Sequence, residues 1–456
     1  MQTLSYRKIF ATWWPLAASW LFMGTELPMI SAIMARLADP KIHLAAYGGV
    51  VFPLALIIEA PIIMLLSAST ALSKDSASYK KIYRFMMWAG GLLTVLHFLL
   101  AFTPLYYPVV VGLMGVPDEI VESARLGLMI MIPWTWTIAY RRYQQGVLIR
   151  FGYSRAVGVG TAIRLASNAA MMIILLLLDR WNEGLTIPGI VVGTSGIAAG
   201  VIAEAIYAGL RVQPVLRGEL QTAPRVDPAL TWRTFNAFYI PLVLTAVINM
   251  LAQPAAPAAI SRMPLALESL AALPVVAGLT FMFRSLGFAY NEVVVALLDS
   301  PGSTNRLRRF AHMLSVITTL GLVAMAATPL STFWFVSVSG LDQELGVLAR
   351  GGLLAAALWP GLSVLQNWYQ GVLVNQRQTY QVTISVVILV GVTLAGLFVG
   401  TAIGQFVGLY VGMIAFVIGQ AAQVIWLWWA ARPVLANTIA RDNQFDENLS
   451  LATAAD

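Results

Sequence analysis

The stretch that decides the fold runs from Thr379 to Ala431 and reads TYQVTISVVILVGVTLAGLFVGTAIGQFVGLYVGMIAFVIGQAAQVIWLWWAA. It contains no Asp, Glu, Lys or Arg residue. About 20 predominantly apolar residues cross the hydrocarbon core of a bilayer, so this stretch is long enough for two spans. The segment from Gly400 to Gly404 marks a reversal between them. We therefore predict two consecutive transmembrane helices, at 379–400 and 405–430.

The rest of the chain has the same character. Hydrophobic residues make up 59% of the 456 residues and charged residues only 11%, whereas globular proteins are about 25% charged. Long apolar runs replace the ten-residue alternation of an outer-membrane barrel. The predicted fold is an all-α polytopic membrane protein with twelve transmembrane helices, the other ten at 10–34, 45–70, 84–111, 120–147, 156–178, 187–210, 235–259, 269–297, 309–336 and 345–373.

The distribution of basic residues predicts the orientation. Arg164 and Arg284 lie well inside predicted spans, and most of the other Lys and Arg residues lie at the N-terminus, near the cytoplasmic ends of the spans or in the tail. Six lie after odd-numbered spans: Arg36, Lys41, Arg125, Arg180, Arg262 and Arg350. The positive-inside rule therefore predicts a multi-pass protein of the inner (plasma) membrane with both termini in the cytoplasm.

The two halves of the chain repeat each other at an offset of 225 or 226 residues. The segment 143–148 (YQQGVL) matches 368–373 (WYQGVL), and Ala124-Arg125 matches Ala349-Arg350. Six spans per half is an even number, so the halves are parallel repeats. The predicted organisation is an N-terminal six-helix bundle at 1–210, a cytoplasmic linker at 211–233, a C-terminal six-helix bundle at 234–431 and a cytoplasmic tail at 432–456.

The sequence lacks the motifs that several classes of enzyme and metal-binding protein require. Cys is absent, and the His residues at 43, 97 and 312 are too far apart for a local metal motif. No Walker loop, Gly-x-Ser-x-Gly elbow or His-Glu-x-x-His helix occurs, so we expect no enzyme, no metal and no cofactor beyond a coupling H⁺ or Na⁺. The net charge of +7 suits cytoplasmic loops, so we expect no nucleic-acid partner. The expected partners are the lipid bilayer and a small-molecule substrate, and the expected state is a monomer.

Short motifs surround the fourth predicted span. The segment GVPDEI (115–120) precedes it, Arg142 and Gln145-Gly146 lie near its end, GYSR (152–155) follows it, and GLDQE (340–344) repeats the first motif in the second half. This set resembles the pattern of MATE transporters in the multidrug/oligosaccharidyl-lipid/polysaccharide (MOP) exporter superfamily. The loop at 73–79 does not supply the Asp-Arg pattern of major facilitators. The resemblance implies a MATE-like fold of two bundles.

A narrower resemblance rests on shorter stretches. Gly24-Thr25-Glu26, Ala46-Tyr47-Gly48, and Pro254 followed by Ile260-Ser261-Arg262 are similar to stretches of the progressive ankylosis protein family. That family is associated with export of citrate, nucleotides and pyrophosphate. Lipid-linked substrate flippases of the superfamily usually have fourteen helices, whereas this chain has length for twelve.

Ionisable side chains inside the predicted spans require an explanation, because each costs about 2.5–3.5 kcal/mol at the bilayer centre. In the first half these are Glu26, Glu59, Arg164 and Glu204. One interpretation is an interior salt-bridge network in which Arg164 pairs with one of the three acids. The other is that a carboxylate binds H⁺ or Na⁺ and couples an ion gradient to transport, with Glu26, Glu59 and Glu204 as candidates.

Glu26 is the first candidate for ion coupling, because Pro28 frees backbone groups close to it. The MATE resemblance implies that Asn168 shares its site. At the equivalent place in the second half the acid is replaced, and Asn249 and Gln253 are expected to supply polar groups for substrate. Pro28 and Pro254 are the predicted hinges.

Arg164 and Arg284 indicate another chemistry. An arginine fork binds carboxylate or phosphate through two hydrogen bonds and keeps its charge. One such residue in each half is expected to bind an anionic substrate. The alternatives for Arg284 are an ion pair with Glu292, two turns away, or extension towards the cytoplasm.

The sequence thus favours a secondary antiporter that exports small organic or phosphorylated anions by alternating access. One alternative is a proton- or sodium-coupled MATE-type exporter of cationic drugs. A second alternative is a flippase for a lipid-linked substrate.

Overall fold

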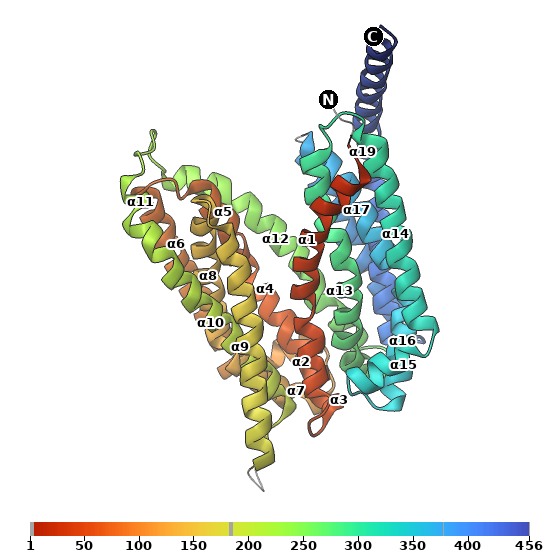
Figure 1. Ribbon diagram of the computed structural model, residues 1–456. Helices are drawn as coiled ribbons and strands as arrows, with labels where there is room; N and C mark the ends of the chain where they lie inside the picture. Colours follow the sequence, from red (N-terminus) through yellow and green to blue (C-terminus); the bar gives the residue numbers. More distant parts are fainter. Residues whose placement is uncertain (1–3, 182–185, 377, 456) are drawn as a thin grey trace. The chain divides into compact units, whose positions relative to one another are not determined.

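The protein is built of helices. We describe it from a computed structural model that covers residues 4–181, 186–376 and 378–455, without the side chains at 249, 252 and 446–455. In these residues every regular element is an α-helix or a short π-helix. Figure 1 shows the elements, which are α1 (Tyr6–Gly24), α2 (Glu26–Met34), α3 (Pro40–Ala46), η1 (Tyr47–Val51), α4 (Phe52–Ile63), α5 (Leu65–Leu72), α6 (Ser76–Phe102), η2 (Pro108–Leu113), α7 (Asp118–Ile130), α8 (Ile132–Arg150), α9 (Ser154–Trp181), α10 (Gly189–Arg217), α11 (Glu219–Thr222), α12 (Trp232–Ile260), α13 (Ala266–Leu297), α14 (Ser303–Ala327), α15 (Leu330–Thr332), η3 (Phe333–Val338), α16 (Gln343–Ala355), α17 (Trp359–Asn375), α18 (Thr379–Ile403) and α19 (Gly408–Ala455).

The predicted fold class is confirmed. Within the described residues, 11 helical segments are long and apolar enough to cross a membrane, and each of the twelve predicted spans coincides with helix. The fourth predicted span is the one that is not among these 11 segments. It consists of two helices, α7 and α8, which are separated by a break at Met131. Arg125, Arg141 and Arg142 make it more polar than the others.

The chain forms two compact units, and their boundaries differ from the predicted bundles. The N-terminal unit contains Met29–Pro274 and Ser339–Leu341. The C-terminal unit contains Met1–Pro28, Val275–Val338 and Asp342–Asp456. The first helix of each half therefore belongs to the unit formed by the other half, which the predicted boundary at 211–233 did not anticipate.

The packing of α1 explains its place in the C-terminal unit. The indole Nε1 of Trp13 donates a hydrogen bond to the carbonyl of Leu286 at 2.9 Å. The Trp13 ring meets Phe310 edge-on at 5.8 Å, and about two turns further on Trp20 meets Phe288 in the same way at 5.5 Å. Edge-to-face aromatic pairs add about 0.5–1.5 kcal/mol to the burial of the rings. Aromatic contacts and one buried hydrogen bond therefore fix α1 on α13 and α14.

The packing of α12 repeats these contacts in the N-terminal unit. Tyr239, 226 positions after Trp13, donates its hydroxyl to the carbonyl of Pro61 at 2.6 Å. Its ring meets Phe85 edge-on at 5.0 Å, and Phe85 is the counterpart of Phe310. The same three-residue contact is thus made twice, once in each unit, at the offset found in the sequence.

Two further pairs of positions reproduce the internal repeat. The side chain of Arg125 donates to the carbonyl of Ala101 at 2.9 Å, and Arg350 donates to the carbonyl of Ala326 at 2.8 Å. The loops before α7 and α16 each contain a glycine with positive φ, at +64° and +75°, a conformation that residues with a Cβ avoid. The halves are therefore structural repeats as well as sequence repeats.

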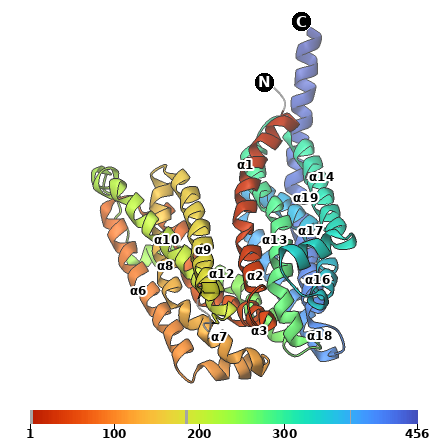
Figure 2. The same cartoon turned by 60° about the horizontal axis from the view of Figure 1, so that its bottom comes forward.

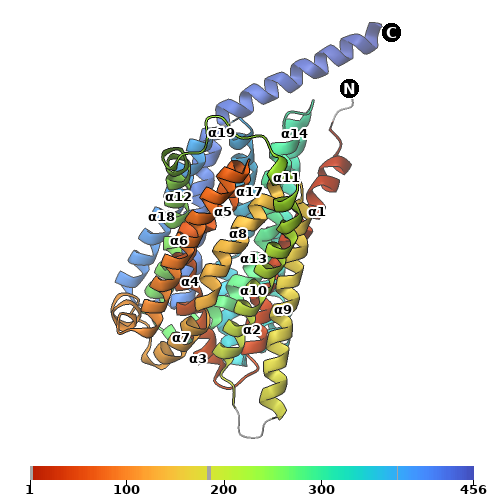
Figure 3. The ribbon, with the colours of Figure 1, turned by 90° about the vertical axis from the view of Figure 1, so that its left-hand side faces the viewer.

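One helix lies at the centre of each unit. In the N-terminal unit α8 contacts α4, α5, α6, α9 and α10, and Figure 2 shows it among them. Its counterpart α17 contacts α14, α18 and α19 in the C-terminal unit. Figure 3 shows that α19 continues as one helix past its neighbours in that unit. The polar side chains of α8 at Arg141, Gln144 and Gln145 are consequently buried inside the N-terminal unit.

The linker between the halves is tied to the N-terminal unit by Asp75. One carboxylate oxygen caps α6 by accepting the backbone N–H of Ser78 at 2.8 Å, and the other accepts the backbone N–H of Val226 at 3.0 Å. Burial by itself would raise the pKa of Asp75, but the hydrogen bonds from Ser78 and Val226 and the charge of Arg225 outweigh it, so this pKa lies below its usual value. Ionised Asp75 therefore stabilises the folded chain.

We predict that Asp75→Ala lowers the free energy of unfolding by about 1 kcal/mol near neutral pH, because a helix cap is lost. A carboxyl whose pKa is lowered by folding stabilises the protein above its unfolded pKa of about 3.9, and that contribution disappears as the pH falls through the folded value. The difference between parent and variant, measured by thermal unfolding, should therefore shrink below about pH 4. Asp118→Ala, at an exposed position, is the control, and a pH-independent difference for Asp75→Ala would contradict the assignment.

Candidate functional site

The two predicted hinge prolines have different surroundings. Pro28 lies in α2, directly after the break at Thr25, and the chain passes from the C-terminal to the N-terminal unit just after it. Pro254 lies inside α12, which runs on without interruption. A second crossing between the units occurs within α13, just after Pro274. The role of Pro28 and Pro254 as hinges stays a prediction.

A glycine lies against the proline at each of these two crossing points. A Cβ on Gly48 would lie 2.6 Å from Cδ of Pro274, and one on Gly278 would lie 3.0 Å from Cδ of Pro28. A contact of 2.6 Å forces something to move, whereas one of 3.0 Å needs a shift of a few tenths of an ångström. The absence of a side chain therefore matters most at Gly48, where a helix packs directly on the Pro274 ring.

The N-terminal unit contains a buried charge cluster centred on Glu204 of α10. The Glu204 carboxylate is fully buried and accepts a hydrogen bond from Arg141 at 2.6 Å. Its second oxygen accepts the side-chain amide of Gln145 at 2.8 Å. The Nε of Arg164 lies 3.8 Å from the same carboxylate. Residues 141 and 145 are one turn apart on α8, which presents both to the acid.

Glu59 of α4 is the second acid of this cluster. Its side chain is 4% exposed, and its Oε2 has no hydrogen-bond partner among the described residues. Electrostatic attraction links it to Arg142, Arg141 and Arg164, most strongly to the first. Three arginines thus face two carboxylates, so the cluster has excess positive charge when all five groups are ionised.

Of the three acids considered as partners for Arg164, Glu204 is the one that forms an ion pair with it in this cluster, and Glu59 lies in the same cluster. Asn168 lies one turn after Arg164 on α9 with a fully buried side chain. Gly196 and Gly200 of α10 make room for it, because a Cβ on Gly196 would lie 2.7 Å from the Asn168 amide oxygen. Small residues at these two positions therefore let α9 and α10 approach closely.

Glu26, by contrast, belongs to the C-terminal unit, at the start of α2. Asn168 belongs to the N-terminal unit. The proposed sharing of one ion site by Glu26 and Asn168 stays a prediction. The expectation that Glu26 groups with Glu59 and Glu204 in one bundle was wrong, because α1 packs with the second half of the chain.

Arg284 of α13 lies in the C-terminal unit and has aromatic neighbours instead of an acid. Its guanidinium lies 4.2 Å from the ring centroid of Trp359 and 5.3 Å from that of Phe288. Its Nε is buried without a hydrogen-bond partner in the described part of the chain. The alternative pairing with Glu292 is not made there. Stacking on a desolvated aromatic face stabilises a cation by about 2 kcal/mol. The guanidinium is thus held by aromatic rings and has no counter-charge among the described residues.

A buried amide network continues from Trp359. Its indole donates to Oε1 of Gln420 at 3.3 Å, and the amide of Gln420 donates to Gln366 at 2.9 Å and to Gln423 at 3.1 Å. Gln423 in turn donates to the hydroxyl of Ser385 at 3.2 Å. The network joins α17, α18 and α19, and its first member, Trp359, carries the ring on which Arg284 stacks.

The remaining predicted substrate residues lie on α12. Gln253 is exposed, and the side chain of Asn249 lies outside the described residues. In the described ranges, no three His, Asp or Glu side chains come together closely enough to hold a metal ion.

Sequence reasoning missed Arg141 and the glutamine network. Arg141, Arg142 and Gln145 fall near the end of the fourth predicted span, where a positive charge is expected to reach the aqueous edge. The signal that could have found them is their spacing, since residues 141 and 145 share a helix face within a span. Gln366, Gln420 and Gln423 also lie inside apolar runs, where amide side chains need partners.

Comparisons with known proteins support the fold. A scan against protein-family models found no match, and no curated protein matches the chain. The chain is similar to the solved structure of a multidrug resistance MATE family transporter of the MOP superfamily in its inward-facing conformation, with a TM-score of 0.70 and 14% identity over 91% of this chain and 95% of that one. It is also similar to the lipid II flippase MurJ in its inward closed conformation, with a TM-score of 0.68 and 14% identity over 96% and 92% of the two chains.

A third similar structure is that of a MOP superfamily transporter from Pyrococcus furiosus, with a TM-score of 0.51 and 14% identity over 96% of this chain and 99% of that one. Likeness at this level of identity establishes the fold alone. The chain therefore has the MATE-like fold implied by its motifs, and the resemblance to the progressive ankylosis family stays a prediction.

We predict that Glu204→Gln destabilises the protein by about 3–5 kcal/mol, because it leaves a buried arginine without its counter-charge. Thermal unfolding of the purified protein in detergent measures this loss. Glu119→Gln removes an exposed carboxylate and should change the midpoint little. If both variants unfold at the parent temperature, the cluster does not contribute to stability.

Proposed function

We propose that the protein is a secondary transporter of the plasma membrane that exports small organic or phosphorylated anions, of the citrate or pyrophosphate kind, by alternating access. The observation that carries the proposal is Arg284, a cation within a helix long and apolar enough to span a membrane that makes no ion pair among the described residues. We further propose that it acts as a monomer with both termini in the cytoplasm.

The surroundings of Arg284 suit an anion-binding role. A charge at the bilayer centre is costly and is normally paired, yet Arg284 is held by the rings of Trp359 and Phe288. A guanidinium that stacks on an aromatic ring keeps N–H donors at its edge for a carboxylate or phosphate. The amides of Gln366 and Gln420 add neutral donors and acceptors, which bind an oxyanion without cancelling the charge.

The cluster in the N-terminal unit supports the same chemistry. Arg141, Arg142 and Arg164 outnumber Glu59 and Glu204 there. Glu204 accepts hydrogen bonds from Arg141 and Gln145, so we assign the ion pair of Glu204 and Arg141 to the stability of the unit. We propose that Arg164, whose side chain retains 12% exposure, is the second residue that binds substrate.

Coupling to H⁺ or Na⁺ is assigned to the carboxylates. Glu59 is the best candidate of the N-terminal unit, because one of its oxygens accepts no hydrogen bond from the described residues and is open to a proton or a sodium ion. Glu26, beside the helix break before Pro28, is the candidate of the C-terminal unit. Asn168 and Glu204 are proposed to support the site in the N-terminal unit.

Export of cationic drugs is the first alternative. The similar MATE structure is that of a multidrug resistance transporter, and buried acids such as Glu59 are the groups that would hold an organic cation. The similar transporter from Pyrococcus furiosus is described as having a binding pocket of reverse polarity that suggests a different function. The present chain has an arginine, Arg284, that forms no ion pair among the described residues, and this favours the anion.

Flipping of a lipid-linked substrate is the second alternative. It is supported by the similarity to the lipid II flippase MurJ. Such a substrate also carries phosphate, so the arginines serve both functions equally well. Transport of a water-soluble anion distinguishes the two.

We predict that Arg284→Ala weakens binding of citrate and pyrophosphate roughly ten- to hundredfold, because a charge-assisted contact of about 1.5–3 kcal/mol is lost. Arg284→Lys should lose less, because the charge is kept while the planar fork is not. Binding to the purified protein, measured by calorimetry, checks both changes.

Arg155→Ala is the matched control for Arg284→Ala, since it removes an exposed arginine. Each variant must elute as a single folded species. A folded Arg284→Ala protein that binds citrate and pyrophosphate like the parent contradicts the anion proposal. A parent that binds only ethidium supports the drug exporter instead.

We predict that Glu59→Gln abolishes the dependence of transport on a pH or Na⁺ gradient while substrate binding persists, because the neutral amide cannot exchange a proton or hold a cation. Uptake of labelled citrate into proteoliposomes with imposed gradients measures this. Glu26→Gln is tested in parallel, and Glu122→Gln, an exposed position, is the control. Gradient dependence that survives in both Glu59→Gln and Glu26→Gln would remove these residues from coupling.

A further inference from the structure

The C-terminal unit has a hollow between α14, α17 and α19 that none of the transport residues uses. Its volume is about 430 Å³, and it is lined by Arg308, Arg309, His312, Tyr369, Trp428 and Leu435. Arg308 and Arg309 lie in the second turn of α14, and Trp428 lies in the tryptophan-rich part of α19. Tryptophan and arginine together are typical of the level at which a bilayer meets water.

The hollow is cationic. Arg432 does not line the hollow itself, but its guanidinium lies 3.6 Å from the ring centroid of the lining residue Trp428. Within the described ranges, no carboxylate forms an ion pair with Arg308, Arg309 or Arg432. The ring of His312 is oriented by a 3.0 Å contact between its Nδ1 and the carbonyl of Arg308. Three arginines are therefore gathered here with no acidic partner.

A second, apolar hollow adjoins the first. It has a volume of about 360 Å³ and is lined by Ile388, Ala422, Ile425, Trp426, Trp428 and Trp429. Trp428 belongs to both hollows. Ile425 and Trp429 are 63% and 56% exposed. The helix α14 adds exposed apolar residues directly after His312 and in the next two turns, at Met313, Ile317 and Leu320. The cationic hollow thus borders a surface suited to hydrocarbon.

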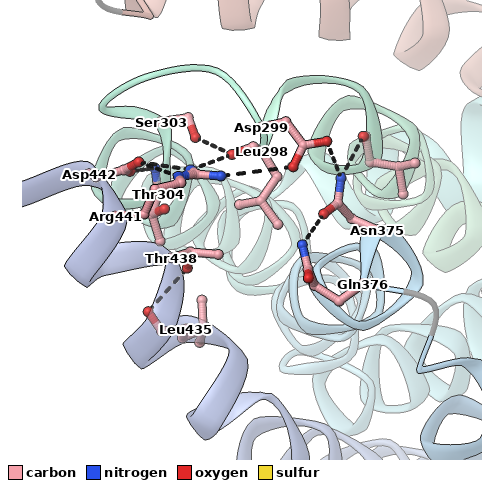
Figure 4. A network of polar contacts seen from close by, with 11 residues as sticks. Leu298, Asp299, Ser303, Thr304, Asn375, Gln376, Leu435, Thr438, Arg441 and Asp442 are labelled. Carbon is pink, nitrogen blue, oxygen red and sulfur yellow. Dashed lines mark hydrogen bonds and ion pairs between the residues drawn. The ribbon is translucent and has the colours of Figure 1, made fainter. Parts of the chain in front are cut away.

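Polar contacts hold α14 and α19 in place beside the hollows. Figure 4 shows Asp442 of α19 at the start of α14, where its carboxylate accepts the backbone N–H of Thr304 at 2.9 Å. Arg441 donates to the carbonyl of Leu298 at 2.8 Å and to Asp442 at 2.8 Å. Below the surface, side chains of α14, α17 and α19 share one core. The arginines and Trp428 are consequently presented by a fixed framework.

We propose that these two hollows bind one anionic glycerophospholipid, with its phosphate among Arg308, Arg309 and Arg432 and an acyl chain along the apolar hollow beyond Trp428. Arginine binds phosphate oxygens through paired hydrogen bonds, and basic pockets between membrane helices bind lipid head groups. A free phosphate has the same charge but gains nothing from the apolar hollow. The adjacency of the two hollows therefore favours a lipid as the ligand.

The test is a titration of the purified full-length protein with dioleoyl phosphatidylglycerol, dioleoyl phosphatidylcholine or inorganic phosphate, with bound ligand counted by native mass spectrometry. We expect phosphatidylglycerol to bind and the other two to bind far more weakly. The double variant Arg308→Gln, Arg309→Gln should lower the affinity for phosphatidylglycerol about 25-fold.

The matched control is Arg155→Gln, Arg233→Gln, which removes the same charge at exposed positions of the N-terminal unit. It should change the affinity by less than about threefold, because neither arginine lines the hollows and exposed charges are screened by salt. Trp428→Leu should also weaken binding, whereas Trp88→Leu, at an 81% exposed tryptophan, should not. Equal losses in the two double variants would overturn the site.

Two further outcomes count against the proposal. Phosphatidylcholine that binds as tightly as phosphatidylglycerol would show that the arginines do not recognise charge. Inorganic phosphate that binds as tightly as phosphatidylglycerol and displaces it would make the ligand a soluble anion. Should the double variant of Arg308 and Arg309 unfold, Arg432→Gln provides the same test from α19.

Discussion

Both units depend on an exchange of first helices. The first helix of the first half, α1, packs with helices of the second half, and the first helix of the second half, α12, packs with helices of the first half. Trp13 in one unit and Tyr239 in the other each donate a hydrogen bond to a main-chain carbonyl and meet a phenylalanine edge-on. An aromatic ring with a polar tip suits this position, because it buries a large apolar surface while satisfying its own donor. Without this exchange, α13 and α4 would each lose the helix that covers them.

The second constraint is the cost of charge inside a membrane protein. The N-terminal unit meets it by pairing, since Glu204 accepts from Arg141 and Gln145 in a site closed to solvent. The C-terminal unit meets it differently, because Arg284 is held by aromatic rings and no acid of the described chain approaches it. Buried pairs contribute little net stability but are costly to break. A stacked cation that forms no ion pair in the described chain is a better candidate for substrate binding than a satisfied ion pair. Arg284 is therefore a stronger candidate than the charge cluster around Glu204.

Much of the fold was predictable because it depends on local properties of the sequence. The spans follow from apolar length and the repeat from a constant offset. The need of buried charges for partners predicted that Arg164 could pair with one of three acids, but not that the acid is Glu204. The exchange of first helices could not be predicted in this way, since an apolar helix fits either bundle equally well by composition. The stacking of Arg284 on Trp359 likewise joins residues far apart in the chain, and no periodicity connects them.

The exchange also sets the order in which the chain can complete its parts during synthesis. When Tyr239 emerges, its partner Pro61 has already been made, 178 residues earlier. Trp13, in contrast, must wait for Leu286, which follows it by 273 residues, and at about 5–20 residues per second this takes roughly 15–50 s. Through that time α1 sits in the bilayer without its tertiary contacts. A newly made chain thus depends on lipid, the insertion machinery or a chaperone to shield its first helix until the second half arrives.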